Sequence, residues 1–204
     1  IADGYIYDFG VSFTGVCRLC VKGEKGQRIE LRHADSLVNG DLNLLQIWFL
    51  TDHWPRDKEI VHCDTYVCRG EGVEVYQPTF TYHGFRYVQI KTDPGVVVTK
   101  IRAWEVHTLV EQTGDFHCDN TLLNQIYAAV LQTEQNNLHS VPTDCPQRDE
   151  RLAWINDMTV RGEEALYNFD MMPFFEKWLQ DLADSQDPET GAIPDTAPYF
   201  YGGR

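Results

Sequence analysis

The sequence predicts an antiparallel β-sandwich followed by a helical segment, because its apolar residues follow two different periods. Before about residue 112, short runs of β-branched and aromatic residues alternate with clusters of turn-forming residues. After residue 113, apolar residues recur at the spacing of an α-helix. All of the strand-like runs precede all of the helical ones, which indicates two domains rather than an alternating α/β fold. We therefore expect a sandwich domain over residues 1–112 and a helical domain over residues 113–204.

The first half predicts strands at residues 5–7, 16–21, 28–31, 65–67, 73–76, 79–82, 86–90 and 96–106. Turn-forming residues separate these runs, notably at residues 23–26, 39–41, 70–72 and 93–95. Many short strands at this spacing are typical of an antiparallel sandwich or jelly roll.

The second half predicts helices. Asp119 or Asn120 can cap the first one, whose apolar positions are Leu122, Leu123, Ile126, Tyr127, Val130 and Leu131. A second helix is expected to start after Pro146 and to end at about Asn168. A third begins near Pro173, because proline suits a first helical turn, and its apolar stripe is Phe174, Phe175, Trp178, Leu179, Leu182 and Ala183.

The charge balance narrows the possible partners. The formal net charge is −14, and residues 116–204 contain 15 Asp and Glu against 5 Lys and Arg. Such a negative field repels phosphate backbones, so we expect no nucleic-acid partner. It suits a neutral or cationic substrate, or a reaction that builds positive charge, although an acidic surface that only aids solubility is the simpler alternative. No apolar run approaches the roughly 20 residues that span a bilayer, and residues 1–10 lack the pattern of a signal peptide.

Two cysteine pairs raise the alternative of a zinc site, namely Cys17 with Cys20 and Cys63 with Cys68. Both pairs lie in strand-like runs, where an odd separation points two side chains to opposite faces. Neither pair encloses Gly, Pro or Asn that would make a turn. We therefore expect no metal and no cofactor, but buried free thiols, which favour a reducing compartment. The sequence leaves the location open between the cytoplasm and the periplasm of a bacterium.

The densest group of functional side chains lies between Asp144 and Asp157. On a helix that starts near Arg148, the spacing would place Glu150, Trp154 and Asp157 along one face. An indole beside a carboxyl group disfavours the charged form, and a protonated carboxylic acid is what a glycosidase needs to protonate a leaving oxygen. The alternative is an ordinary acidic helix start, with the acids complementing the helix dipole and paired with Arg148 and Arg151.

The same segment carries a family resemblance. Residues 142–152, Pro-Thr-Asp-Cys-Pro-Gln-Arg-Asp-Glu-Arg-Leu, resemble the signature of the bacterial α-L-rhamnosidases, an inverting glycoside hydrolase family. Further segments resemble this family in the expected order, at residues 5–10, 13–15, 32–35, 64–66, 80–88, 120–127, 174–178 and 191–195. The matches cover nearly the whole chain.

The resemblance implies a concanavalin-like β-sandwich followed by the beginning of an (α/α)6, six-hairpin barrel, and hydrolysis of terminal α-L-rhamnosides with inversion. It implies that Glu150 is the general acid. It also implies that Asp144, Arg148 and Asp157 hold the rhamnose hydroxyls and that Trp154 forms a wall of the sugar pocket. The expected partner is accordingly a rhamnose-containing oligosaccharide or glycoside. Asp195 is expected to approach the mouth of the site in an intact barrel.

One departure from the family pattern concerns the pocket lining. Residues 153–157 read Ala-Trp-Ile-Asn-Asp, where the family usually has Gly-Trp-Thr-Gly-Asp. We expect these bulkier residues to change the lining of the pocket, and with it the fine specificity, more than the type of reaction. In addition, the family takes its general base from a later part of the barrel, so we expect a chain that ends at Arg204 to have little activity alone. Unpartnered helical faces would then favour self-association into a homo-oligomer.

Alternatives remain for the first domain. A non-catalytic carbohydrate-binding sandwich with a helical cap is the competing function, with Trp48, Trp54 and Trp104 as a sugar-stacking platform. Packing in a core or interface is the simpler role for these indoles. Similarly, His83 could belong to a binding loop, but a tight bend at Gly84 and an ion pair of Arg86 with a nearby acid are the expected structural roles.

Overall fold

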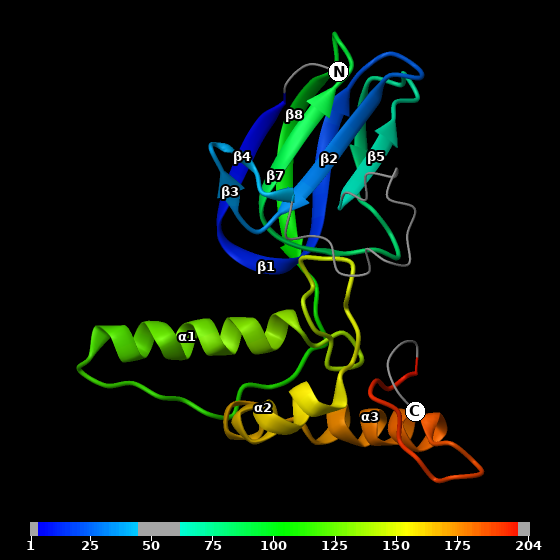
Figure 1. Ribbon diagram of the computed structural model, residues 1–204. Helices are drawn as coiled ribbons and strands as arrows, with labels where there is room; N and C mark the ends of the chain where they lie inside the picture. The colour runs from blue at the N-terminus through cyan, green and yellow to red at the C-terminus, as the bar shows by residue number, and fades with distance from the viewer. Residues whose placement is uncertain (1–3, 45–61, 200–204) are drawn as a thin grey trace. The chain divides into compact units, whose positions relative to one another are not determined.

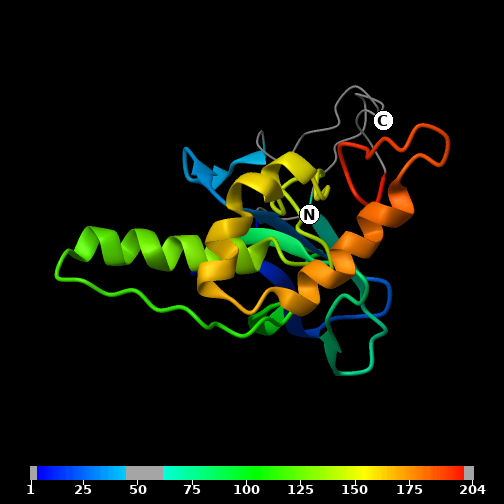
Figure 2. The ribbon, with the colours of Figure 1, turned by 90° about the horizontal axis from the view of Figure 1, so that it is seen from below.

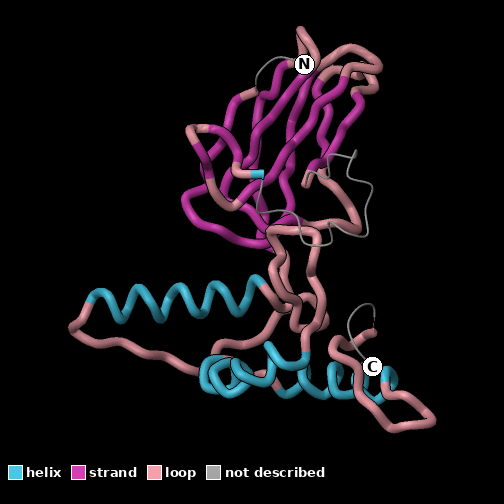
Figure 3. The backbone as a smooth tube through the Cα atoms, in the orientation of Figure 1, coloured by secondary structure: helices cyan, strands magenta, loops and turns pink. Residues whose placement is uncertain are grey.

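A computed structural model describes residues 4–44 and 62–199 of the chain. The chain divides into two compact units, each described here by itself. The first unit comprises residues 1–106 together with the short segment Pro146–Glu150. The second comprises residues 107–145 and 151–204. In the chain, the described strands all precede the described α-helices, and Figure 3 draws strands in magenta and helices in cyan.

The described part of the first unit is an antiparallel β structure (Figure 1). A large sheet has the strand order β5-β2-β7-β1-β6, with β8 also paired to β1, and β3 and β4 form a small hairpin. The strands are β1 (Tyr5–Lys22), β2 (Arg28–Ala34), β3 (Leu37–Val38), β4 (Asp41–Leu42), β5 (Cys63–Val67), β6 (Val73–Tyr76), β7 (His83–Thr92) and β8 (Val97–Glu105).

The long strand β1 folds the sheet around its core. Its first part, up to Gly15, pairs with β7, and its second part, from Gly15 to Lys22, pairs with β8 and β6. The register shifts between Asp8 and Phe13, which breaks the ladder and re-aims the strand. The sheet thereby encloses a buried apolar core that includes Leu19, Leu31 and Phe85. The antiparallel β structure that the sequence predicts for this part of the chain is confirmed.

Two strand predictions need correction. The runs at residues 5–7 and 16–21 belong to one strand, β1, because its ladder continues with new partners past the register shift. Residues 79–82 do not form a strand. Phe80 has a φ of 64°, which is incompatible with an extended ladder, and its side chain is exposed. The turn predicted at residues 39–41 is confirmed by positive φ at Asn39 and Gly40 between β3 and β4.

The described part of the second unit contains α1 (Thr121–Asn136), α2 (Ile155–Asn168) and α3 (Met172–Ser185). The Asn120 side chain accepts hydrogen bonds from the amides of Leu122 and Leu123, so the predicted cap of α1 is confirmed. Pro173 lies in the first turn of α3, also as predicted. Leu138, Met158, Phe169, Phe174 and Trp178 form the core of the unit.

The predicted start of α2 is wrong, although its end at Asn168 is right. The helix begins at Ile155 rather than near Arg148, because Arg151 has a φ of 57° and Trp154 is extended. Glu150 therefore lies on an irregular segment, and it does not share a helical face with Trp154 and Asp157.

The segment after α3 returns to the start of α2, as Figure 2 shows for the red end of the chain. The Ile155 amide donates to the Asp195 carbonyl at 3.0 Å, and the Ala197 amide donates to the Ala153 carbonyl at 3.1 Å. The Trp178 indole nitrogen donates to the Ala197 carbonyl and fixes the same segment on α3. Among the described helices, none is long and apolar enough to cross a bilayer.

Candidate active site

The segment that carries Glu150 is fixed by strand β7 of the first unit. The Gly84 amide donates a hydrogen bond of 3.0 Å to the Pro146 carbonyl. The backbone of Gln147 runs so close that a Cβ atom on Gly84 would lie 2.6 Å from its amide nitrogen. Gly84 does not have a positive φ in the strand, so the expected tight bend is wrong. Glycine is required here because another backbone approaches it closely.

Glu150 and Arg148 form a buried ion pair on this segment. The Arg148 Nε donates to Glu150 Oε2 at 2.8 Å, and the Arg148 Nη2 contacts the same oxygen. The Glu150 side chain is only 3% exposed, whereas Arg148 keeps 29% of its surface in contact with solvent. The carboxylate is thus withdrawn from bulk water and held by a cation at a defined position.

The chain turns sharply on either side of the segment. Cys145 and Arg151, which flank it, have φ angles of 47° and 57°, and neither is a glycine. Such left-handed residues cost energy and cluster at functional sites, where the surrounding structure holds them. In the second unit, the Asp144 amide donates to the Leu152 carbonyl and the Arg151 amide donates to the Asp144 carbonyl, both at 3.0 Å. These bonds fix the backbone of the predicted sugar ligand Asp144.

Trp154 and Asp157 share a pocket in the second unit. The pocket has a volume of about 520 Å³ and is lined by Trp154, Ile155, Asn156, Asp157, Thr159, Ile193, Pro194 and Asp195. The structure thus brings an indole and two carboxylates together from the start of α2 and from the returning segment. The sequence did not single out Ile193 or Thr159 as pocket residues. They come together only because the segment after α3 folds back and brings Ile193 beside α2, the helix that carries Thr159.

The predicted site residues therefore fall into two groups. Arg148 and Glu150 belong to the first unit and contact each other. Asp144, Trp154 and Asp157 belong to the second unit, where Trp154 and Asp157 line one pocket.

A buried histidine cluster lies next to Gly84 in the first unit, and the sequence suggested only that one of its members, His83, could belong to a binding loop. The His83 Nε2 is 3.0 Å from Asp64 Oδ1, and the His33 ring stacks on the His83 ring with centroids 4.1 Å apart. The His33 Nδ1 lies 3.0 Å from the His62 carbonyl oxygen. Burial lowers the pKa of His33 to about 3, which keeps this imidazole neutral. The cluster therefore packs as a hydrogen-bonded part of the core.

The same cluster has the donor types of a metal site. Potential ligand atoms of His33, Asp64 and His83 all lie within 4.8 Å of one another. Cys17, Cys20, Cys63 and Cys68, by contrast, belong to no such group within the part of the chain that the structure describes. Cys17 faces the core with Leu19, whereas Cys20 points to the other face of β1, as the odd spacing predicted.

The structure also tests what the sequence predicted for Arg86 and for the tryptophans of the first domain. Arg86 forms two hydrogen bonds with Asp8, of 2.7 and 2.8 Å, so its predicted ion pair with a nearby acid is confirmed. Trp104 is 49% exposed on β8 and does not pack in the core. Trp48 and Trp54 lie outside the described residues.

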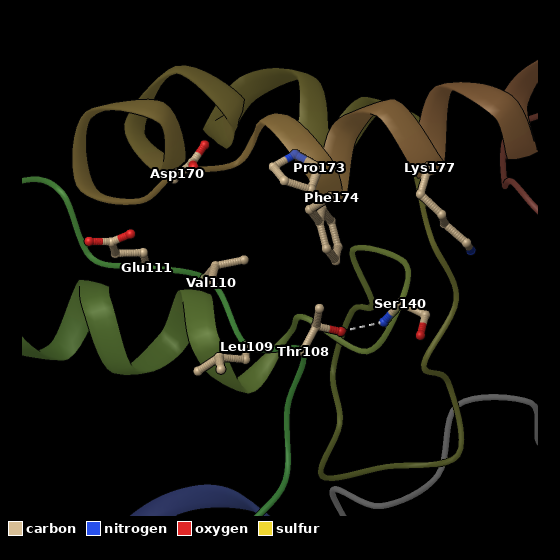
Figure 4. Close-up of a pocket in the computed structure, with 9 residues that line it drawn as sticks. All are labelled: Thr108, Leu109, Val110, Glu111, Ser140, Asp170, Pro173, Phe174 and Lys177. Carbon is tan, nitrogen blue, oxygen red and sulfur yellow. Dashed lines mark hydrogen bonds between the residues drawn. The ribbon is translucent and has the colours of Figure 1, made fainter.

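A further pocket, of about 330 Å³, contains none of the predicted site residues (Figure 4). It lies in the second unit between the chain before α1 and the start of α3. The Phe174 ring points toward the Thr108 side of this pocket, and the Ser140 amide donates to Thr108 Oγ1 at 2.7 Å. Apolar side chains such as Val110 and Phe174 line it together with the charged side chains of Glu111, Asp170 and Lys177.

Comparison with known proteins identifies both halves of the chain. Residues 2–107 match the bacterial α-L-rhamnosidase concanavalin-like domain, and residues 111–203 match the bacterial α-L-rhamnosidase 6 hairpin glycosidase domain. An α-L-rhamnosidase of Streptomyces avermitilis is 36% identical over 195 residues, which cover 95% of this chain and 18% of that protein. One from Formosa agariphila is 34% identical over 194 residues, covering 93% of this chain and 20% of that protein.

Solved structures agree with these matches. The α-L-rhamnosidase from Dictyoglumus thermophilum superposes with a TM-score of 0.84 at 40% identity, covering 99% of this chain and 22% of that one. The Streptomyces avermitilis enzyme complexed with L-rhamnose superposes with a TM-score of 0.83 at 35% identity, covering 96% of this chain and 18% of that one. The chain thus spans about a fifth of the length of the curated relatives it matches.

Proposed function

Because the chain belongs to the bacterial α-L-rhamnosidase family, we propose that it is part of a glycoside hydrolase that cleaves terminal α-L-rhamnosides with inversion. In this proposal the chain supplies the general acid, Glu150. The observation that carries it is the buried position of the Glu150 carboxyl group on a segment fixed by a strand of the sheet domain. A catalytic acid needs this kind of support, because its position must be fixed to a fraction of an ångström.

In the proposed reaction, one proton is given to the leaving oxygen and another is taken from the attacking water molecule. Once Arg148 has turned from Glu150 toward the sugar and the carboxyl group carries a proton, Glu150 donates this proton to the glycosidic oxygen as the bond to the anomeric carbon breaks. The sugar passes through an oxocarbenium-like transition state. A water molecule attacks the opposite face of the sugar, and a second carboxylate, about 6.5–9.5 Å from the acid, takes the proton of that water. The rhamnose unit is released with the inverted anomeric configuration.

The remaining site residues would hold the sugar. Asp144 and Asp157 accept hydrogen bonds from rhamnose hydroxyls, and Arg148 donates to them when it turns from Glu150 toward the sugar. Trp154 forms an apolar wall for the methyl-bearing face of the ring. The pocket of about 520 Å³ that Trp154 and Asp157 share with Asp195 supports this role, because its size suits one sugar unit.

We assign no general base to residues 1–204, and we propose that it comes from another part of a longer protein. The chain by itself is then expected to bind rhamnose without turning over an aryl α-L-rhamnoside at a measurable rate. Turnover by the 204-residue chain that Glu150→Gln abolishes would refute this part of the proposal.

The decisive experiment uses the complete enzyme that contains this chain. Glu150→Gln should lower kcat for a rhamnoside with a poor leaving group by a factor of about 10²–10⁴, the usual contribution of a general acid. With an activated aryl leaving group the loss should be much smaller, because that oxygen departs without protonation. Glu176→Gln, which removes an exposed carboxylate on α3, is the matched control and should leave both rates unchanged.

A second candidate function is a non-catalytic carbohydrate-binding sandwich, and the half-exposed indole of Trp104 favours it. The two functions differ in where rhamnose binds. Protection from hydrogen exchange around Trp154 and Asp157 supports the hydrolase, whereas protection confined to the sandwich around Trp104 supports the binding module.

A further inference from the structure

The outer face of the β1–β8 ladder gathers cations in one shallow cavity of about 230 Å³. Along both strands, side chains alternate between the core and this face, so that Leu19 and Ile101 pack inward whereas Arg18 and Arg102 point outward. The cavity is lined by Arg18, Cys20, Lys100, Arg102 and Trp104.

The register between β1 and β8 brings like charges together, which destabilises the sheet when no ligand neutralises them. Arg18 and Arg102 are direct cross-strand partners, and Lys100 pairs with Cys20 one step along the same face. Like charges directly opposite each other destabilise a sheet. Within residues 4–44 and 62–199, none of these three cations forms a salt bridge, although the chain has a net charge of −14. Three unneutralised cations in one cavity of an acidic protein indicate that the missing negative charge is supplied by a ligand.

We propose that this cavity, here called the β1–β8 cationic face, binds an acidic saccharide through the carboxylate of a uronic-acid unit. A carboxylate is planar and matches the fork of a guanidinium group, so Arg18 and Arg102 together can clamp its two oxygens. The indole of Trp104, 49% exposed at the end of the cationic row, offers an apolar plate for the sugar ring beside that carboxylate. A free inorganic anion would use the guanidinium groups but not the indole.

This site is independent of the proposed catalytic residues. It uses none of the side chains assigned to rhamnose, and its existence does not depend on Glu150 being an acid catalyst. It would give the protein a second contact with a saccharide that carries both neutral and acidic sugars.

The test is isothermal titration calorimetry of the chain with a trimer of galacturonic acid, with its methyl ester as the uncharged match. The acid should bind and the ester should not. Arg102→Gln and Arg18→Gln should each weaken binding at least about tenfold, equivalent to about 1.4 kcal/mol. Arg102→Lys keeps the charge but loses the fork, so it should retain only part of the affinity. Trp104→Ala should also weaken binding, whereas Lys25→Gln, an exposed lysine in the turn after β1, should not.

Several outcomes would overturn the proposal. These are no binding of the acid trimer, equal binding of acid and ester, or a loss with Lys25→Gln as large as that with Arg102→Gln. Binding of inorganic phosphate as tight as that of the trimer would reduce the site to a general anion site, and tighter binding of a single-stranded oligonucleotide would point to a phosphate backbone instead. Glu150→Gln should leave the affinity unchanged, so the result does not depend on the proposed hydrolase activity.

Discussion

Gly84 and Gln147 lie so close that their backbones leave no room for a side chain, with a Cβ atom at position 84 placed 2.6 Å from the Gln147 amide nitrogen. This contact ties a strand of the sheet to the segment on which Arg148 and Glu150 form their ion pair. The Asp64–His83 hydrogen bond fixes the residue just before Gly84. A residue of the sheet thus sets the position of the proposed acid.

Gly84→Ala is expected to displace residues 146–147 and to destabilise the first unit by about 1–3 kcal/mol, the usual cost of overpacking. In the complete enzyme it should mimic Glu150→Gln in part, lowering kcat more for poor leaving groups than for activated ones. Denaturant unfolding and the two kcat values measure these effects.

The matched control is Gly162→Ala in α2, where a Cβ atom would have no neighbour closer than 3.8 Å. This substitution should stabilise the chain by about 0.5–1 kcal/mol, because alanine is the better helix former. Equal losses with both types of leaving group in Gly84→Ala would show that Gly84 supports folding alone and does not position the acid.

Glu134 of α1 and Arg161 of α2 form a buried ion pair, with Arg161 Nη1 2.7 Å from Glu134 Oε2. Arg161→Ala should destabilise the second unit by about 3–5 kcal/mol, because it leaves a buried carboxylate without its partner. Burial raises the pKa of Glu134, so part of this loss should be relieved at acidic pH, where the carboxyl group can be neutral.

Lys177→Ala, which removes the cation of the exposed Lys177–Asp181 pair on α3, is the control for Arg161 and should cost less than about 1 kcal/mol. Chemical unfolding followed by the helical circular dichroism signal measures both. Similar losses for the two variants would contradict the assignment of Glu134 and Arg161 as a structural pair.

Stability should fall on acidification below about pH 6.5, the ordinary pKa of histidine. Burial lowers the pKa of His33 to about 3 and that of His139 to about 4. Each histidine therefore binds its proton in the unfolded chain before it does so in the folded one. Each should contribute a loss of about 1.4 kcal/mol per pH unit, full stability being present above pH 6.5 and falling between pH 6.5 and the folded pKa.

Urea unfolding at pH 7.5, 6 and 5 checks this dependence. His139→Gln should flatten the slope, whereas His117→Gln, at an exposed position, should leave it unchanged. A free energy of unfolding that stays constant from pH 7.5 to 5 would contradict the burial of neutral imidazoles.

Helix α1 exposes apolar side chains, including Leu122, Leu123 and Ile126. An apolar face of this kind favours association, so the chain should form oligomers as its concentration rises. Ile126→Lys should shift it toward monomer in sedimentation velocity experiments, whereas Val160→Lys, at an exposed apolar position of α2, should not. A monomer at every concentration tested would remove this expectation. The apolar stripe of α3 that contains Phe174 and Trp178, by contrast, is packed in the core of its unit.

Local patterns in the sequence determined most of the elements of this protein. The strand character of β1 and β7, the cap at Asn120 and the start of α3 at Pro173 follow from residue type and backbone chemistry within a few residues. The signature at residues 142–152 also identified the family, because residue types at a fixed spacing need no coordinates to be matched.

Tertiary structure alone decided how the proposed site is built. It moved Glu150 off helix α2, since Arg151 adopts a left-handed conformation that no local period encodes. In the first unit it placed Gly84 against Gln147, and in the second it placed Asp195 beside Trp154. The two residues of each pair are more than 40 positions apart in the sequence. Contacts between residues remote in sequence depend on how whole elements pack, and a period of two or 3.6 residues carries no information about that packing.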